Sequence, residues 1–202
     1  QLANDVSFNF FDDPKLDWES CIDENKLIID ILKKSKVFVD VGANTGFYSC
    51  ISLALKKQTI AIEPISENVN MLIKNIQINK FNDIEIYPVA AADKNSFLTI
   101  YGHGVTASLY KNWDNVLQNR ISEKIPTLTL DTILGDKFID KQIFIMIDNE
   151  NAQYVTLLGS KKILSSKIKP IWLVEIFSDF SIEQKITSVK KTYYQEVFDI
   201  FT

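Results

Sequence analysis

A short loop with two glycines follows an apolar stretch typical of a buried strand. The stretch Val37–Val41 runs into a turn that contains Gly42 and Gly46, and a segment with helical spacing begins directly after it. Such a turn brings backbone N–H groups and a helix N-terminus to the end of the strand, which suits a nucleotide-like ligand. Gly42 allows close approach of the backbone, and Asn44 tolerates a positive φ. We therefore predict that Gly42, Ala43, Asn44 and Gly46 bind a cofactor.

The loop does not follow the usual phosphate-binding patterns. A dinucleotide fingerprint that starts at Gly42 requires glycine at positions 44 and 47, where the chain has Asn44 and Phe47. A phosphate loop with Gly-Lys-Ser/Thr is also absent. The acidic residue Glu63 closes the next predicted strand, about 20 residues after the first glycine. This spacing predicts that Glu63 binds both hydroxyls of a ribose; the alternative is an incidental charge at a helix entry.

Further polar side chains are candidates for catalysis. Asp148 and Glu150 follow the predicted strand Ile143–Ile147, and ligands of open α/β sheets bind outside the carboxyl ends of the strands. Asp148 would orient an acceptor or act as a base; the alternative is a cap of the following helix. His103 is a candidate general base, although a histidine between two glycines is also compatible with simple exposure. Two carboxylates alone do not make a site for a hard cation, so we expect no metal.

The elements that must position these residues alternate between short β-branched stretches and longer helical ones. This alternation predicts an α/β fold with a Rossmann-like, doubly wound and mostly parallel sheet. An inserted region around residues 90–140 interrupts it and carries an added strand, Phe97–Tyr101. The predicted strands are Val37–Val41, Thr59–Ile62, Ile84–Pro88, Ile143–Ile147, Ile171–Ile176 and Val197–Phe201. The predicted helices are Asp23–Lys34, Gly46–Lys57, Ser66–Asn79, Ala152–Leu164 and Ile182–Lys191.

Length and charge set further limits. The 202 residues fit one domain, with an entry or lid segment at 1–35 and the Rossmann-like core at 36–202. The phenylalanines of the entry segment either cover the core or form part of a lid. A net charge of -4 argues against nucleic acid as a partner, and the short lysine runs are interpreted as solvated helix faces. No apolar run is long enough to span a membrane. With only two cysteines and no signal peptide, we expect a cytoplasmic protein.

The segment Asp40–Ser49 resembles the first motif of the FkbM family of S-adenosylmethionine-dependent methyltransferases. Ala61–Pro64 resembles the second motif of the same family. The resemblance extends over roughly residues 37–176. It continues through Ser108–Leu109, Thr129–Leu134, Ile147–Gln153, Leu158–Gly159 and Leu173–Glu175.

The resemblance implies a class I methyltransferase fold that uses S-adenosylmethionine. Asp40 would lie beneath the methionine end of the cofactor, and Asp93 would contact adenine, unless Asp93 only forms a turn. The acceptor would be a hydroxyl on a sugar, a glycolipid or a polyketide-like small molecule. Where the family usually reads Asp-Val-Glu-Gly-Ala-Glu, the chain reads Asp148–Gln153 with Asn151 and Gln153 in place of glycine and acid. These two residues favour an alternative, a catalytically degenerate module that binds cofactor or partners without turnover.

Overall fold

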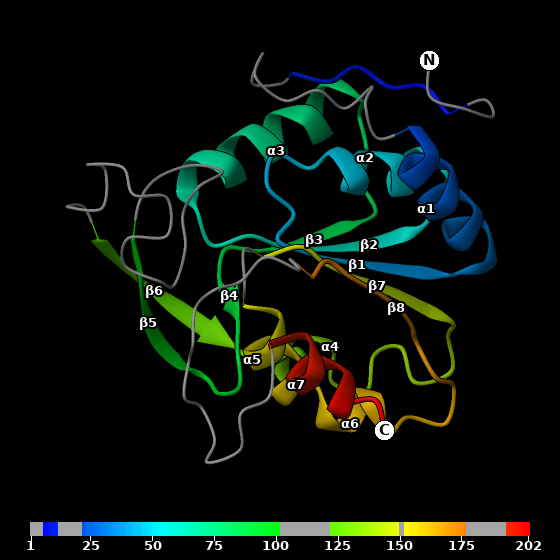
Figure 1. Cartoon of the computed structure of the whole chain (residues 1–202). Helices are drawn as coiled ribbons and strands as arrows, with labels where there is room; N and C mark the ends of the chain where they lie inside the picture. Colours follow the sequence, from blue (N-terminus) through cyan, green and yellow to red (C-terminus); the bar gives the residue numbers. More distant parts are fainter. Residues whose placement is uncertain (1–5, 12–21, 102–121, 150–151, 177–192) are drawn as a thin grey trace.

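A parallel sheet forms the centre of the molecule in the computed structural model, which describes residues 6–11, 22–101, 122–149, 152–176 and 193–202 (Figure 1). Its strands lie in the order β3, β2, β1, β7, β8, and each neighbouring pair is parallel. This order confirms the predicted Rossmann-like, doubly wound α/β fold. The strands are β1 (Val37–Val41), β2 (Gln58–Ile62), β3 (Ile84–Tyr87), β7 (Ile143–Ile147) and β8 (Ile171–Val174).

The strands form where apolar residues are continuous because helices cover both faces of the sheet. Every residue of β1 and β7 is buried, and both strands have the predicted bounds. β3 ends at Tyr87 rather than at the predicted Pro88, since proline has no N–H to donate to the ladder. β8 ends at Val174, two residues before the predicted end. The buried strands were thus the best predicted elements.

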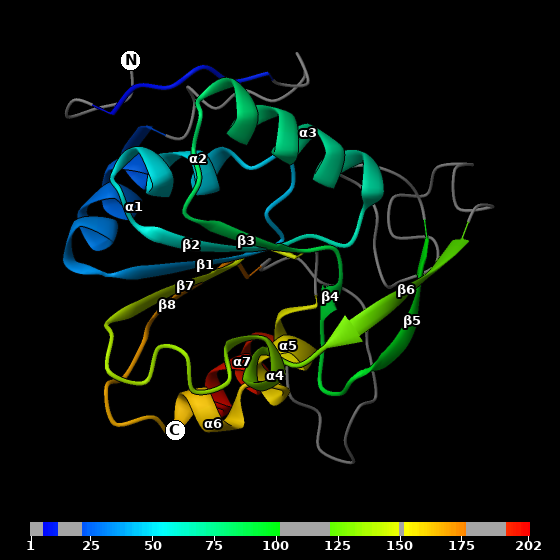
Figure 2. The same cartoon turned by 180° about the vertical axis from the view of Figure 1, so that it is seen from behind.

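Two groups of helices enclose the sheet (Figure 1, Figure 2). One face carries α1 (Ile22–Lys34), α2 (Phe47–Ala54) and α3 (Ser66–Ile78), and the other carries α4 (Leu130–Leu134), α5 (Gln153–Leu158), α6 (Lys161–Leu164) and α7 (Tyr193–Asp199). Successive β1 side chains point to opposite faces. Val39 and Val41 pack with the α4–α7 layer, whereas Phe38 packs with α1 and α2. Asp40 therefore points toward α2.

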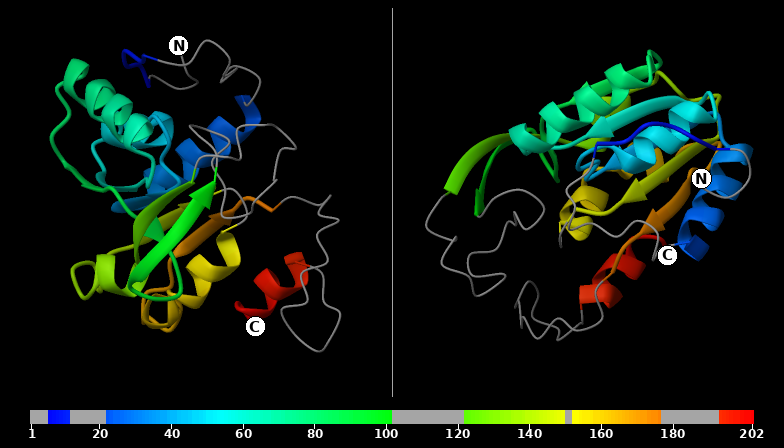
Figure 3. Two further views of the ribbon diagram at one scale, coloured as in Figure 1. Left: turned by 90° about the vertical axis from the view of Figure 1, so that its left-hand side faces the viewer. Right: turned by 90° about the horizontal axis from the view of Figure 1, so that it is seen from above.

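The predicted insertion contains a second, three-stranded sheet beside the carboxyl ends of the central strands (Figure 1, Figure 3). Its strands are β4 (Ala90–Ala91), β5 (Ser96–Tyr101) and β6 (Ser122–Leu128), in the order β4, β6, β5. Strand β5 confirms the predicted added strand Phe97–Tyr101, although it begins one residue earlier, at Ser96. The insertion also supplies α4, which was not predicted.

The C-terminal segment differs from the prediction. Residues Val197–Phe201 were predicted as a strand, but most of them belong to helix α7. Val197 is 1% exposed and Ile200 packs against the same core, which places these residues, three apart, on one helix face. Phe198 is 60% exposed. A short apolar run cannot be distinguished from a helix segment by its composition, and this led to the wrong prediction. The predicted helix Ile182–Lys191 lies outside the described residues.

The predicted helix Ala152–Leu164 is two short helices, α5 and α6, which Gly159 and Ser160 separate. A Cβ atom on Gly159 would overlap the Ala92 carbonyl oxygen, so the chain passes close to the β4 segment here. The Asp131 carboxylate then accepts the backbone N–H groups of Lys162 and Ile163 at 2.9 and 3.1 Å. These contacts redirect the chain after α5.

No helix within the described ranges is long and apolar enough to cross a membrane.

Candidate cofactor site

Three polar positions lie side by side just beyond the carboxyl ends of adjacent strands. The backbone ladder continues past each strand: Gly42 N–H donates to Ile62 O at 2.9 Å, and Asp148 N–H donates to Val41 O at 2.9 Å. Glu63 N–H donates to Tyr87 O at 3.1 Å. Gly42, Glu63 and Asp148 are therefore fixed in register at one edge of the sheet.

The loop between β1 and α2 has the backbone conformation that its sequence predicted. Gly42, Asn44 and Gly46 have φ values of 85°, 49° and 89°. A Cβ atom on Gly42 would overlap the carbonyl oxygen of Asp148, so only glycine fits between β1 and β7. Gly46 precedes the first residue of α2, and Ala43 is buried beneath the loop. The loop is consequently closely packed against both neighbouring strands.

The Glu63 carboxylate is 4% exposed and holds this loop. Its Oε2 accepts the backbone N–H of Asn44 at 2.9 Å. Its Oε1 accepts the backbone N–H of Ile65 at 2.9 Å and the Asn68 side-chain amide at 3.2 Å. Burial raises the pKa of Glu63, and these hydrogen bonds lower it in part. Glu63 thus links the glycine loop to the start of α3.

Asp40 is a second buried carboxylate at this edge, directed at α2. Ser49 Oγ donates to Asp40 Oδ2 at 2.6 Å, and both side chains are buried. Burial raises the Asp40 pKa to about 7; the Ser49 hydrogen bond opposes the rise, and the charges of Asp148 and Glu63 add to it. The structure therefore brings Asp40, Glu63 and Asp148 close enough to interact electrostatically.

Three buried side-chain oxygens near this loop have no hydrogen-bond partner among the described residues: Asn44 Oδ1, Thr45 Oγ1 and Asn149 Oδ1. The Asn149 amide is oriented, because its Nδ2 donates to Thr156 Oγ1 at 2.9 Å and Thr156 Oγ1 donates to Ala91 O at 3.0 Å. Buried acceptors of this kind match a ligand that brings donors. The sequence did not assign a cofactor-binding role to Asn149 or Thr156.

The remaining predicted site residues lie in different environments. Asp93 follows β4 and is exposed. Asp148 is half-buried and does not cap α5, because the N-cap residue of that helix is Ala152. Glu150 and His103 lie outside the described residues. Within those residues, no group of three or more histidine, cysteine, aspartate or glutamate side chains is arranged to hold a metal ion.

An extended N-terminal segment, Val6–Phe11, runs alongside the C-terminal part of α3, which connects it to the same loop. Asn75 accepts the Phe11 N–H at its Oδ1 at 2.7 Å, and its Nδ2 donates to Phe11 O at 3.0 Å and to Thr45 O at 2.9 Å. Asn79 bonds the backbone of Asn9 in the same way. Asn75 and Asn79 are four residues apart in α3, a rise of about 6 Å. Their partners Phe11 and Asn9 are two residues apart in the extended segment, a rise of about 6.6 Å. The two spacings match, so each asparagine can bond the backbone of one residue in the segment. Asn75 thereby ties the segment to the glycine loop.

The aromatic residues of this segment separate into two groups. Phe8 and Phe10 are half-buried and pack against the ring of Phe47, the first residue of α2, with centroid distances of 6.0 and 5.5 Å. Phe11 is 55% exposed. Phe8 and Phe10 therefore cover the core, and Phe11 does not.

Replacement of Asn75 by alanine should destabilise the protein by about 1 to 3 kcal/mol, because the change leaves the buried Thr45 carbonyl and the Phe11 backbone without their partner. Hydrogen exchange of residues 6–11 should accelerate, and the urea midpoint should fall. Asn79→Ala is the matched control, because its contacts to Asn9 are exposed and the loop contact is retained. Equal effects of the two variants would contradict a special role of Asn75.

Comparisons with known proteins relate the chain to one family. The model of the methyltransferase FkbM domain matches residues 40–201. No curated protein matches the chain. Among solved structures, a proposed RNA methyltransferase from Pyrococcus horikoshii matches with 15% identity and a TM-score of 0.41. That match covers 75% of this chain and 61% of the other chain.

Proposed function

Because the chain belongs to the FkbM methyltransferase family, we propose that it transfers the methyl group of S-adenosylmethionine to a hydroxyl of a sugar, a glycolipid or a polyketide-like small molecule. The observation that carries the proposal is the pair of buried carboxylates, Asp40 and Glu63, on either side of a loop that admits only glycine at position 42. The acceptor class rests on the resemblance of the motifs alone.

The residues at this edge fit S-adenosylmethionine by their hydrogen-bonding character. The cofactor presents donors: an amino group, two ribose hydroxyls and the exocyclic amine of adenine. The protein presents acceptors in the Asp40 and Glu63 carboxylates and in the buried oxygens Asn44 Oδ1 and Asn149 Oδ1. Asp40 would hold the amino group, and Glu63 would hold the ribose with the acceptor capacity that its three present bonds leave. Asn149 lies against Gly42 and contacts the β4 segment through Thr156, so its Oδ1 would accept a hydrogen bond from the adenine amine.

S-adenosylmethionine would supply an activated methyl group on a sulfonium centre. The remaining task of the chain is to hold the acceptor hydroxyl in line and to take up its proton. Asp148 is half-buried and its backbone lies against Gly42. In this proposal its carboxylate would orient the hydroxyl or accept its proton. Glu150 and His103 remain candidates for the same step.

The alternative function is a module that binds cofactor without turnover. Gln153 is fully buried at the start of α5, where the family usually has an acid. An amide at this position carries no charge and cannot take up a proton. Gln153→Glu restores the acid and tests whether this departure limits turnover.

Two measurements separate these functions. Calorimetry with S-adenosylmethionine, S-adenosylhomocysteine and NAD tests the cofactor, and we expect the first two to bind and NAD not to. Turnover assays against hydroxylated glycans, lipids and polyketide-like alcohols test catalysis. Binding without methylation across the panel, even after Gln153→Glu, would favour the module. Binding of NAD instead would contradict both functions.

Replacement of Glu63 by alanine should weaken S-adenosylhomocysteine binding by about 1 to 3 kcal/mol, the usual scale for hydrogen bonds to a charged group. The change also releases the Asn44 amide, which loosens the loop. Calorimetry measures the affinity. Glu85→Ala is the matched control, because Glu85 lies in β3 and pairs with Lys137 away from the site. An unchanged affinity in Glu63→Ala would mean that the ribose is held elsewhere.

A further inference from the structure

The fold gathers lysines that are far apart in the sequence at the amino-terminal edge of the central sheet. All five strands are parallel, so the five connections that lead from a helix into a strand lie at this edge, opposite the cofactor site (Figure 1). Eight lysines and three aspartates lie in these connections. The lysines are Lys36, Lys56, Lys57, Lys80, Lys137, Lys141, Lys167 and Lys169, and the aspartates are Asp83, Asp136 and Asp140.

The charge at this edge is opposite in sign to that of the whole chain, which has a net charge of -4. Lys33 and Lys34 extend the group from the last turn of α1. At the carboxyl-terminal edge, the described connections carry the acids Glu63, Asp148 and Glu175, and the charges of Asp93 and Glu123 balance those of Lys94 and Lys124 in the β3-to-α4 connection. The molecule is therefore polarised, with a positive edge and a negative edge.

Intramolecular contacts explain only some of the lysines: Lys57 and Lys169 donate to backbone carbonyls at the ends of α1 and α6. Lys137 pairs with Glu85, and Lys141 donates to Gln58 Oε1. Lys36, Lys56 and Lys167 are exposed, and none of the three has an ion-pair partner among the described residues. Cations stabilise a helix only in its last turn, whereas these three lie beyond the helix ends.

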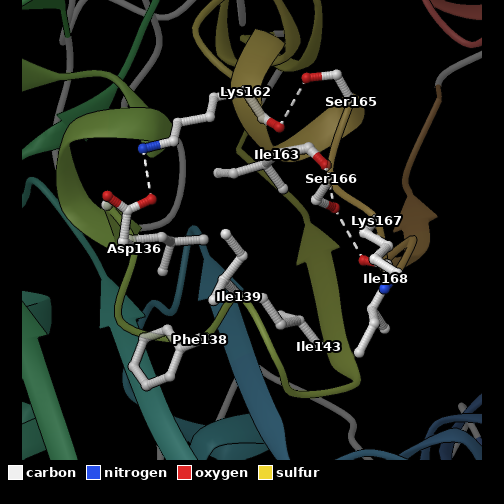
Figure 4. A pocket seen from close by; sticks show the side chains of 12 residues that line it. Asp136, Phe138, Ile139, Ile143, Lys162, Ile163, Ser165, Ser166, Lys167 and Ile168 are labelled. Atoms are coloured by element: carbon white, nitrogen blue, oxygen red, sulfur yellow. Dashed lines mark hydrogen bonds and ion pairs between the residues drawn. The ribbon is translucent and has the colours of Figure 1, made fainter.

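The centre of the same edge is apolar. A cavity of about 270 Å³ lies between the α4–β7 and α6–β8 connections. Figure 4 shows Phe138, Ile139 and Ile143 on one side of it and Ile163 on the other, with the Lys162–Asp136 ion pair above them. Ile139 is 53% exposed. An exposed isoleucine thus lines a cavity whose lining also includes Lys162 and Lys167.

We propose that this edge, defined by the five helix-to-strand connections, docks on an anionic lipid surface, with Ile139 inserted among the lipid chains. Lysines near an anionic leaflet and an apolar side chain at its boundary are the two components of interfacial binding. The observations favour lipid over nucleic acid, because the exposed apolar Ile139 lies among the charged connections and the aromatic Phe138 is only 4% exposed. Nucleic-acid bases stack on exposed aromatic rings.

The docking leaves the cofactor site directed away from the lipid, since the two lie at opposite ends of the same strands. The acceptor would then reach the site from the aqueous side. Docking requires no cofactor, so its failure and the failure of the proposed methyl transfer are observed separately.

Vesicle sedimentation with the full chain tests the proposal. Vesicles of phosphatidylcholine with phosphatidylserine should retain the protein, and vesicles of phosphatidylcholine alone should not. The triple variant Lys36→Gln, Lys56→Gln, Lys167→Gln should reduce the partition coefficient by about tenfold or more. The matched control neutralises three exposed lysines elsewhere, Lys74, Lys94 and Lys124, by the same substitution and should change it by less than about twofold. The melting temperature of each variant verifies folding.

Ile139→Ser separates the apolar contribution from the electrostatic one, because it preserves the charge. It should weaken vesicle binding, and higher salt should weaken it further. Equal losses in the two triple variants, or equal binding to vesicles with and without phosphatidylserine, would overturn the proposal. Binding of an RNA or DNA oligonucleotide that the first triple variant abolishes, without vesicle binding, would identify a nucleic-acid surface instead and would also overturn it.

Discussion

Replacement of Asp40 by asparagine is expected to stabilise the protein at about pH 8 and to weaken cofactor binding. Asp40 is buried with a pKa of about 7, compared with 3.8 for an ordinary aspartate. Its folded pKa lies above the unfolded one, so its contribution to stability is complete below about pH 4 and is lost as the pH rises through about 7. The wild-type protein should therefore become less stable across this range.

The size of the stability gain in Asp40→Asn follows from the raised pKa of Asp40. About three pKa units correspond to roughly 4 kcal/mol of cost for the ionised carboxylate in the folded protein. Asparagine removes this cost and retains an oxygen that accepts the Ser49 hydroxyl. Its buried amide N–H group lacks an acceptor, however, and this reduces the gain in stability by about 1 to 3 kcal/mol. The net gain should be about 1 to 3 kcal/mol at about pH 8 and absent or reversed at about pH 4.

Urea unfolding at several pH values measures this difference, and calorimetry with S-adenosylhomocysteine measures the loss of binding. The exposed Asp83 provides the control, since Asp83→Asn makes the same substitution away from the site. A stability difference between Asp40→Asn and wild type that stays constant with pH would mean that the carboxylate is not buried as the structure places it. Unchanged affinity would remove Asp40 from the cofactor site.

Much of the fold could be predicted because its central strands carry a strong local signal. β1 and β7 are covered on both faces, so their apolar runs are continuous and end at residues that interrupt strands. β6 has no such signal, since it includes Glu123, Lys124 and Pro126. Its strand form depends on pairing with β5, a contact that no local pattern encodes. The wrong assignment of α7 has a similar cause, because the core that receives Val197 forms only after folding.

The candidate site, like the fold, could be predicted only where its residues carry a local signal in the sequence. Glycine spacing and an acid after the next strand pointed to Gly42 and Glu63, and parallel strands necessarily bring their carboxyl ends together. The contacts of Ser49 with Asp40 and of Asn149 with Thr156 were not predictable, because they join residues whose proximity depends on packing. The positive edge was missed for the same reason. Each lysine run was short, and only the parallel sheet places the runs together.

Gly42→Ala should have the largest effect of any conservative change at the site. An alanine at φ 85° is strained, and a left-handed conformation costs an ordinary residue about 1 to 2 kcal/mol. The added methyl would also overlap the Asp148 carbonyl, which is backbone and cannot turn aside. β1 and β7 would have to separate, so we expect a total loss of about 3 to 5 kcal/mol of stability. This is a large part of the usual 5 to 15 kcal/mol.

Gly135→Ala isolates the steric part of this cost. Gly135 also has a positive φ, 52°, but an added Cβ there would meet no atom within 4 Å. Its replacement should therefore cost only the conformational part, about 1 to 3 kcal/mol, because φ 52° with ψ −129° lies in the mirror-β region that glycine favours. Urea unfolding gives both values, and calorimetry should find that S-adenosylhomocysteine binding is lost in Gly42→Ala and retained in Gly135→Ala. Similar stability losses in both variants would show that β1 and β7 are not in contact at Gly42, and the closed loop on which the cofactor assignment rests would then be wrong.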